Sequence, residues 1–251
     1  MNSTLDNIFA GDPEHAAKVA EKNERFADDV VGKFRNYRAV PGGGFPDKVL
    51  KWDVTCAVPS DAQAVYELLG GQPPVERETE AEDALLVATD TNSVPIIISG
   101  PDAIRFDMKH WINGKLAHHC NGVTFLSPDE DKGVACGCPK TIAERKERAK
   151  NERGPKPDIR LTFRLADDPT LGLFEYKTSG WTLLDDLHSI FKGLDAVGGA
   201  ALAQLNNEHV EYTTKAGREV SYTKLQVKIL KAYEDAITDS PEAGYDEEPP
   251  F

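Results

Sequence analysis

Apolar and polar residues alternate along several short stretches of the chain, which is the pattern of a strand with one buried face. The strands predicted from this pattern lie at residues 30–37, 49–58, 84–89, 94–99, 158–166, 171–177, 209–214 and 219–230. Turn-forming residues at 90–93, 167–170 and 215–218 join three successive pairs of these strands. The sequence therefore predicts three β-hairpins.

Helical spacing of apolar residues occupies the stretches between these strands. The predicted helices are a charged arm that begins near Asp12, a helix at 60–71 capped by Ser60, a charged helix at 141–152, an amphipathic helix at 181–194 and a short helix within 196–205. Strands and helices segregate along the chain instead of alternating regularly. The expected fold class is therefore α+β, with antiparallel sheets and packed helices around a central Cys/His knuckle.

Shifts in composition divide the chain into five parts. The expected parts are an N-terminal arm (1–28), an N-terminal α+β half (29–116), the knuckle with its charged helix (117–157), a C-terminal ββαββ half (158–231) and an acidic tail (232–251). The tail is rich in acidic residues and proline, so we expect it to be disordered.

Acidic residues outnumber basic ones by 42 to 29, which gives a formal net charge of −13. This charge argues against a protein whose main affinity comes from neutralising phosphates, and it favours a basic partner. No apolar run approaches the roughly 18–20 residues of a membrane span. The first residues are polar and acidic and do not resemble a signal peptide, so we expect an intracellular protein.

Cysteine and histidine gather between residues 118 and 139. The candidate metal ligands are Cys120, Cys136, Cys138, His118 and His119, with His110 as a further candidate. Three thiolates and one imidazole form a closed tetrahedral site of the kind that holds structural zinc. The sequence therefore predicts a zinc knuckle and leaves the choice of histidine open.

Other states of these cysteines are compatible with the same spacing. Free thiols, a disulfide and an iron–sulfur cluster remain alternatives to zinc. Cys56 stands apart, at the end of a predicted strand, and is interpreted as a core residue.

One arrangement of charged residues is typical of metal-dependent nucleases. Asp158 precedes Glu175 and Lys177 in the order of a site where two carboxylates hold Mg²⁺ and a lysine steadies the attacking water. A cysteine-cluster nuclease is therefore an alternative function.

A single-stranded nucleic-acid binder built on the C-terminal sheet is a third hypothesis. Such a protein needs aromatic and basic residues together on one face. The aromatic residues Trp181, Tyr212 and Tyr222 do not cluster in the sequence, and the net charge opposes this function.

Motifs spread along the chain resemble a known family. They are VVGKFRNY, KWDVTCAVPSDAQAVYELLGG, ISGPDAIR, LAHHCNGV leading to CGCP, DIRLTFRLAD, GLFEYKTSGW and EYTTKAGREVSYTKLQVKIL. In order and spacing, over residues 29–231, they resemble the Gp3-like recombination directionality factors of Streptomyces temperate phages. These proteins act on large serine integrases.

The resemblance implies a non-enzymatic regulator in the cytoplasm of a bacterial host. Such a factor binds the coiled-coil region of an integrase that is bound to att-site DNA, and has little direct DNA binding of its own. It switches recombination from attP × attB integration to attL × attR excision. One departure concerns the metal site, since an all-cysteine site would need a cysteine near 154–156, where this chain has Gly-Pro-Lys. A histidine, His118 or His119, would then complete the zinc site.

Overall fold

The computed structural model describes residues 30–38, 47–79, 81–150, 153–215 and 217–238. The predicted N-terminal arm lies outside these residues. So does the acidic tail from residue 239 onward. The tail's first residues form a short helix, α6 (Tyr233–Thr238), in place of the disorder expected there.

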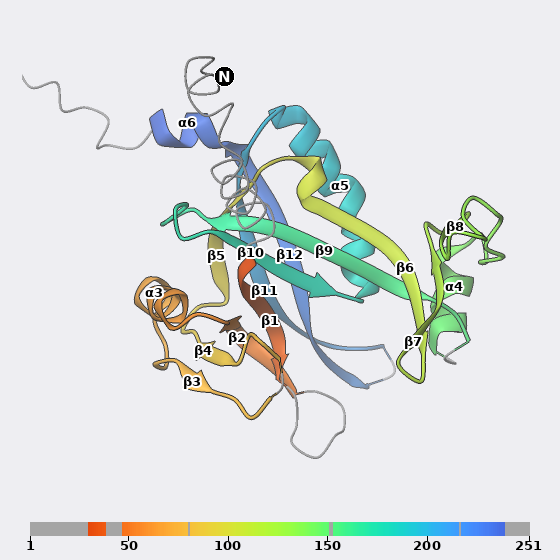
Figure 1. Cartoon of the computed structure of the whole chain (residues 1–251), viewed down its shortest axis with the longest axis horizontal. Coiled ribbons are helices and arrows are strands. Elements are labelled where there is room, and N and C mark those ends of the chain that lie inside the picture. The colour runs from red at the N-terminus through yellow and green to blue at the C-terminus, as the bar shows by residue number, and fades with distance from the viewer. Residues whose placement is uncertain (1–29, 39–46, 80, 151–152, 216, 239–251) are drawn as a thin grey trace, which may run out of the picture.

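Within the described residues, twelve strands form one sheet (Figure 1). The strands are β1 (Val30–Arg38), β2 (Asp47–Cys56), β3 (Val75–Glu76), β4 (Leu85–Ala88), β5 (Ser93–Ile98), β6 (Ile104–Ile112), β7 (Lys115–Cys120), β8 (Phe125–Ser127), β9 (Lys156–Leu165), β10 (Leu173–Thr178), β11 (Ala201–Thr213) and β12 (Glu219–Ala232). The other helices are α3 (Pro59–Leu69), α4 (Ile142–Lys150), α5 (Trp181–Val197) and a 3-10 turn, η1 (Pro101–Ala103).

The two predicted halves share this sheet. The main strand order is β12-β11-β5-β9-β10-β1-β2-β4-β3, and β6 pairs with a second stretch of β9. Strand β5 thus lies between two strands of the C-terminal half, and β1 pairs in parallel with β10. The expectation of separate antiparallel sheets is wrong, because long-range pairing joins strands that are distant in sequence.

The larger of two buried clusters in the described residues is rich in aromatic side chains and lies on one face of the sheet. The Phe34 ring makes edge contacts with Trp52, Phe163 and Phe174, at centroid distances of 5.6, 5.2 and 5.6 Å. The sheet curves enough for the Asn207 amide in β11 to donate to backbone carbonyls of β2. Helices α3 and α5 add their apolar faces to this core.

Three local predictions are wrong. Residues from Ala201 onward form strand β11 instead of a helix, because they pair with β5 on one side and β12 on the other. Strands β4 and β5 do not form a hairpin, since β4 pairs with β2 and β3. Helix α3 starts at Pro59, with no side-chain cap from Ser60. The hairpins β9–β10 and β11–β12 are confirmed.

The metal-ligand candidates lie at one end of the molecule. The β6–β7 hairpin turns at Asn113 and Gly114, both with positive φ, and the chain continues through β8 into α4. We call residues 110–150 the knuckle module; in Figure 1 its elements β7, β8 and α4 lie beyond the end of β9, on the side away from β3. Within the described residues, no helix has the length and apolar character needed to cross a membrane.

Candidate metal centre

Four side chains of the knuckle module converge on one point. One ligand atom each from His118, Cys120, Cys136 and Cys138 lies within 4.8 Å of the other three. The Cys138 Sγ lies 3.7 Å from the Cys120 Sγ and 3.5 Å from the His118 Nε2. Tetrahedral zinc with Zn–S bonds of about 2.3 Å separates two sulfurs by about 3.8 Å. The donor set and its spacing therefore fit a zinc ion.

Strand β7 supplies two of these four side chains. His118 and Cys120 are separated by one residue, so strand alternation places both on the same face. The backbone N–H of Gly122 donates to the Cys120 Sγ at 3.3 Å, which fixes this sulfur at the start of the turn. Cys120 is fully buried. The first arm of the site is thus built by an ordinary strand and its exit turn.

A short loop supplies the other two sulfurs. Gly137 stands between Cys136 and Cys138 with a φ of 68°, a left-handed conformation that glycine adopts at little cost. The Cys136 backbone N–H donates to the Val123 carbonyl, which ties this loop to the first arm. The chain can therefore turn sharply enough to present two sulfurs to one ion.

Helix α4 clamps both ligand arms through two arginines. The Arg145 guanidinium donates to the carbonyls of Pro139 at 2.6 Å and Gly122 at 2.8 Å. Arg148 donates to the carbonyl of Gly137 at 3.2 Å. Three thiolates holding Zn²⁺ would carry a net charge of −1, which the two nearby guanidinium groups would offset. The role of these arginines cannot be predicted from the sequence, because a charged helix gives no indication of which residues face inward.

Burial is the main cause of the shifted pKa values of two candidate ligands, Cys120 and His118. Burial and, to a smaller extent, the charge of the neighbouring Cys138 raise the pKa of the Cys120 thiol to about 12. Burial lowers the pKa of His118, and the positive charges of His110 and Arg148 lower it further. His118 is therefore neutral near pH 7, which is the form that binds metal through a ring nitrogen.

His119 and His110 lie outside this group of four. The His119 Nδ1 lies 2.9 Å from the Ser127 Oγ, and its Nε2 lies 3.2 Å from the Asp107 Oδ2. His110 is the cross-strand neighbour of His118 in the β6–β7 hairpin. Strand alternation already distinguishes the two adjacent histidines, because only His118 shares a face with Cys120.

The fourth cysteine has a structural role, as predicted. Cys56 is fully buried in the main core. Burial raises the pKa of its thiol to about 12, with smaller contributions from the negative charges of Asp61 and Asp83.

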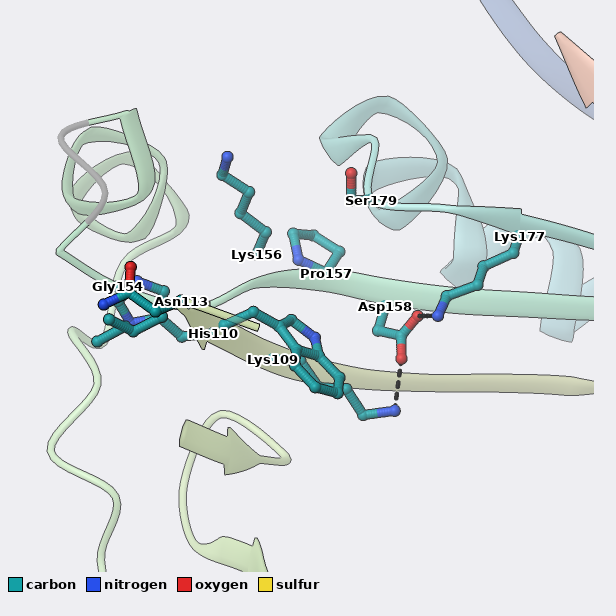
Figure 2. Close-up of a pocket in the computed structure, with 11 residues that line it drawn as sticks. Lys109, His110, Asn113, Gly154, Lys156, Pro157, Asp158, Lys177 and Ser179 are labelled. Atoms are coloured by element: carbon teal, nitrogen blue, oxygen red, sulfur yellow. Dashed lines mark hydrogen bonds and ion pairs between the residues drawn. The ribbon is translucent and has the colours of Figure 1, made fainter. Parts of the chain in front are cut away.

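The residues of the nuclease hypothesis do not form a carboxylate pair. Glu175 lies opposite Thr162, four residues along β9 from Asp158, which corresponds to about 13 Å of strand. The two carboxylates are therefore too far apart to hold one ion. Asp158 is instead held by the ammonium groups of Lys109 and Lys177, the latter at 3.0 Å (Figure 2).

Comparison with known families agrees with the motifs. Residues 17–228 match the Gp3-like family, described as recombination directionality factor-like. The chain belongs to this family. The match spans the main sheet and the knuckle module, so the resemblance seen in the sequence is confirmed. No solved structure matches the chain.

In this Gp3-like chain, exposed apolar side chains concentrate on the knuckle module. Six of the thirteen exposed large apolar side chains in the described residues belong to it: Trp111, Ile112, Leu116, Val123, Val134 and Ile142. Val123 is 70% exposed and Val134 is 56% exposed. Because exposed apolar residues grouped together mark interaction sites, the module is the candidate binding surface.

The three aromatic residues considered for nucleic-acid binding belong to two different parts of the fold, helix α5 and the β11–β12 hairpin. Trp181 begins α5 and packs against the knuckle module, with the Lys146 ammonium 5.8 Å from its ring centroid. Tyr212 and Tyr222 belong to the β11–β12 hairpin.

Proposed function

We propose that the chain is a recombination directionality factor that binds a phage serine integrase and switches it from attP × attB integration to attL × attR excision. The observation that carries this proposal is the family match over most of the chain. The partner is an integrase bound to att-site DNA in the cytoplasm of a bacterial host. The proposed regulator has no catalytic step of its own.

The knuckle module is the part of the chain that we expect to dock on the coiled-coil region of the integrase. Its exposed apolar residues would supply the contact, with Val123 and Val134 as the most exposed aliphatic side chains. Zinc would supply a rigid cross-link between the two ligand arms, with His118 completing the three-cysteine site. A contact surface fixed in this way loses little conformational entropy on binding.

Charge supports the choice of partner. The chain carries a net charge of −13, so long-range attraction favours a basic protein. The switch itself is a shift between two arrangements of the integrase subunits. The factor must bind the excision-competent arrangement about 10⁴-fold more tightly to move an equilibrium from 1:99 to 99:1.

A recombination assay with purified components tests this function. A cognate serine integrase is mixed with attP and attB, or with attL and attR, with and without this protein. We expect excision only when the protein is present, together with suppressed integration. The protein alone should leave all four DNA substrates intact. Unchanged recombination in both directions, with an integrase shown to bind the protein, would contradict the proposal.

A further inference from the structure

A row of positive side chains crosses the polar face of the sheet. Lys177 in β10 pairs with Arg160 in β9, and Arg160 pairs with Arg105 in β6. Arg35 in β1 extends the row, since it directly follows Phe34, the partner of Tyr176. Neighbouring strands are about 4.8 Å apart, so four cationic residues span about 14 Å.

This face is opposite to the one that helix α5 covers. Phe106, the neighbour of Arg105 in β6, contacts the Phe191 ring of α5 at a centroid distance of 5.9 Å. Alternation along the strand then places Arg105 on the other side. Arg105 and Arg160 are both exposed, whereas Leu161, the residue that follows Arg160 in β9, is buried. The row therefore faces solvent.

A second pair of like charges lies beside this row. Lys109 in β6 is paired with Lys156 in β9. Like charges directly opposite one another destabilise a sheet. Asp158 offsets Lys109 and Lys177, as Figure 2 shows, and Glu175 lies 3.6 Å from Arg160. Asp83 lies 2.8 Å from Arg35, and Asp107 lies 3.8 Å from Lys109. The sheet nevertheless retains an excess of positive charge on this face.

Two cations of this face lack a compensating acid. Within the described residues, neither Arg105 nor Lys156 has an ion-pair partner. Lys156 extends away from the Asp158 carboxylate in Figure 2. A chain with a net charge of −13 thus gathers cations here at an energetic cost, which is typical of a functional site.

Two cavities follow the same face and share Lys177. One has a volume of about 530 Å³ and includes Lys109, Trp111 and Lys156 in its lining. The other, of about 420 Å³, includes Arg35, Tyr37 and Arg160. Trp111 is 57% exposed and Tyr37 is 40% exposed. An exposed aromatic ring therefore borders each cavity.

We propose that this basic face binds single-stranded nucleic acid. Its phosphates would contact Arg105, Lys156 and Arg160, and bases would stack on Trp111 and Tyr37. Guanidinium groups bind phosphate oxygens in a bidentate manner, and a basic groove bordered by aromatic rings is the arrangement that single-strand binders use. An acidic peptide would satisfy the cations but would leave both rings without a stacking partner.

This activity goes beyond the directionality function and departs from the expectation of little direct DNA binding. The negative charge of the rest of the chain confines the attraction to short range, so binding should be weak and sensitive to salt. It requires no integrase. Its success or failure is therefore independent of the recombination assay.

The first test compares two charge-matched double variants of the full chain. Arg105→Gln with Lys156→Gln removes the two unpaired cations of the basic face. Lys192→Gln with Arg218→Gln removes two exposed positive charges from α5 and the β11–β12 turn. The probe is a labelled oligothymidine of about 20 nucleotides, longer than the roughly 4–16 nucleotides that one binding fold covers.

We expect the first double variant to bind about tenfold more weakly at about 50 mM salt, with a salt slope lower by about 1.4. The second double variant should bind like the parent protein. Equal losses in both double variants, or no binding of the oligonucleotide by the parent protein, would overturn the proposal.

The second test concerns stacking. Trp111→Ala should weaken oligothymidine binding by about fivefold or more, whereas Leu116→Ala, at the position paired with Trp111, should not. Duplex DNA of the same length should bind less well than the single strand. Equal duplex binding, or displacement of the oligonucleotide by poly-glutamate at the same charge concentration, would rule out a single-strand site.

Discussion

The main sheet and the knuckle module are held together by different means. The main core contains 26 buried residues drawn from both ends of the described chain. A separate cluster of three buried residues consists of Met108, in the part of β6 just before the knuckle module, and of Cys120 and Cys136 within the module. Two of these three are candidate metal ligands. Apolar burial therefore stabilises the sheet, whereas we expect the module to depend on a metal ion that cross-links its two ligand arms.

This difference has a functional consequence. A module with a small core can expose apolar side chains on its surface, because its shape does not depend on burying them. Small domains that cannot bury enough apolar area commonly rely on a metal or on disulfides. We therefore expect the two regions to respond differently to the same treatments.

The largest expected effect follows loss of a zinc ligand. Cys136→Ser should remove zinc and unfold the module locally, since structural zinc contributes about 10–16 kcal/mol in small domains. Hydrogen exchange should show that β7, β8 and α4 lose protection. Protection in β9 and β10 should change only at residues that contact the module. Cys56→Ala, which removes the core thiol, should leave the zinc content at one per chain. Full protection of the module in zinc-free Cys136→Ser protein would show that the module does not depend on a metal ion for its structure.

The second effect concerns the sheet. Phe34→Ala removes a ring that contacts Trp52, Phe163 and Phe174, and should lower the free energy of unfolding by about 3–5 kcal/mol. Denaturant unfolding measures this loss, and zinc content should stay unchanged. The exposed Val75 provides a control, because Val75→Ala should change the free energy of unfolding by less than about 0.5 kcal/mol.

The third prediction separates the two adjacent histidines. His118→Asn should weaken zinc binding by more than about 100-fold, because it removes a ligand, whereas loss of a ligand's supporting hydrogen bond costs 10–100-fold. His119→Asn should change zinc affinity by less than about tenfold, since the contacts of His119 are with Ser127 and Asp107. Competition with a metal indicator measures both affinities. The reverse ranking would assign the fourth ligand to His119.

The smallest expected effect is a pH dependence of the free energy of unfolding that arises in the main sheet. Burial raises the pKa of Asp83, but hydrogen bonds from Thr55 and Arg35 and the charge of Lys33 outweigh it and lower the pKa to about 2. The ionised Asp83 therefore stabilises the fold above about pH 4, and this contribution is lost as the pH falls towards about 2.

Asp83→Asn should reduce this acid sensitivity. The free energy of unfolding of the variant should fall less between about pH 4 and about pH 2 than that of the parent protein. The exposed Asp129 provides a control, and Asp129→Asn should retain the slope of the parent protein. Identical slopes in all three proteins would show that Asp83 does not carry the effect.

The sequence was informative where a pattern is local. Local patterns predicted β9, β10, β12 and the part of β11 from residue 209 onward, together with their turns, and helical spacing predicted α5. The predictions failed where pairing is long-range. No local pattern indicates that β5 lies between β9 and β11, or that the small apolar residues from Ala201 onward pair as a strand.

For the candidate metal site, too, local patterns were informative and long-range contacts were not predictable. Residue type and spacing predicted the three cysteines, and alternation along β7 distinguishes His118 from His119. The clamping by Arg145 and Arg148 was not predictable, because it depends on how α4 folds back onto two turns. The row of positive side chains on the sheet was also not predictable from the sequence, because it joins residues from four strands.

The most direct measurement tests whether the knuckle module carries the directionality function. The excision assay with attL and attR compares the parent protein with Val123→Asp/Val134→Asp and with Val75→Asp, all confirmed to be folded and, for the first variant, zinc-loaded. Val75 is 59% exposed in β3, which Figure 1 places away from the module. We predict that Val75→Asp supports excision like the parent protein and that the module variant loses more than about tenfold, because two carboxylates replace apolar contacts. Full excision with the module variant would contradict the account.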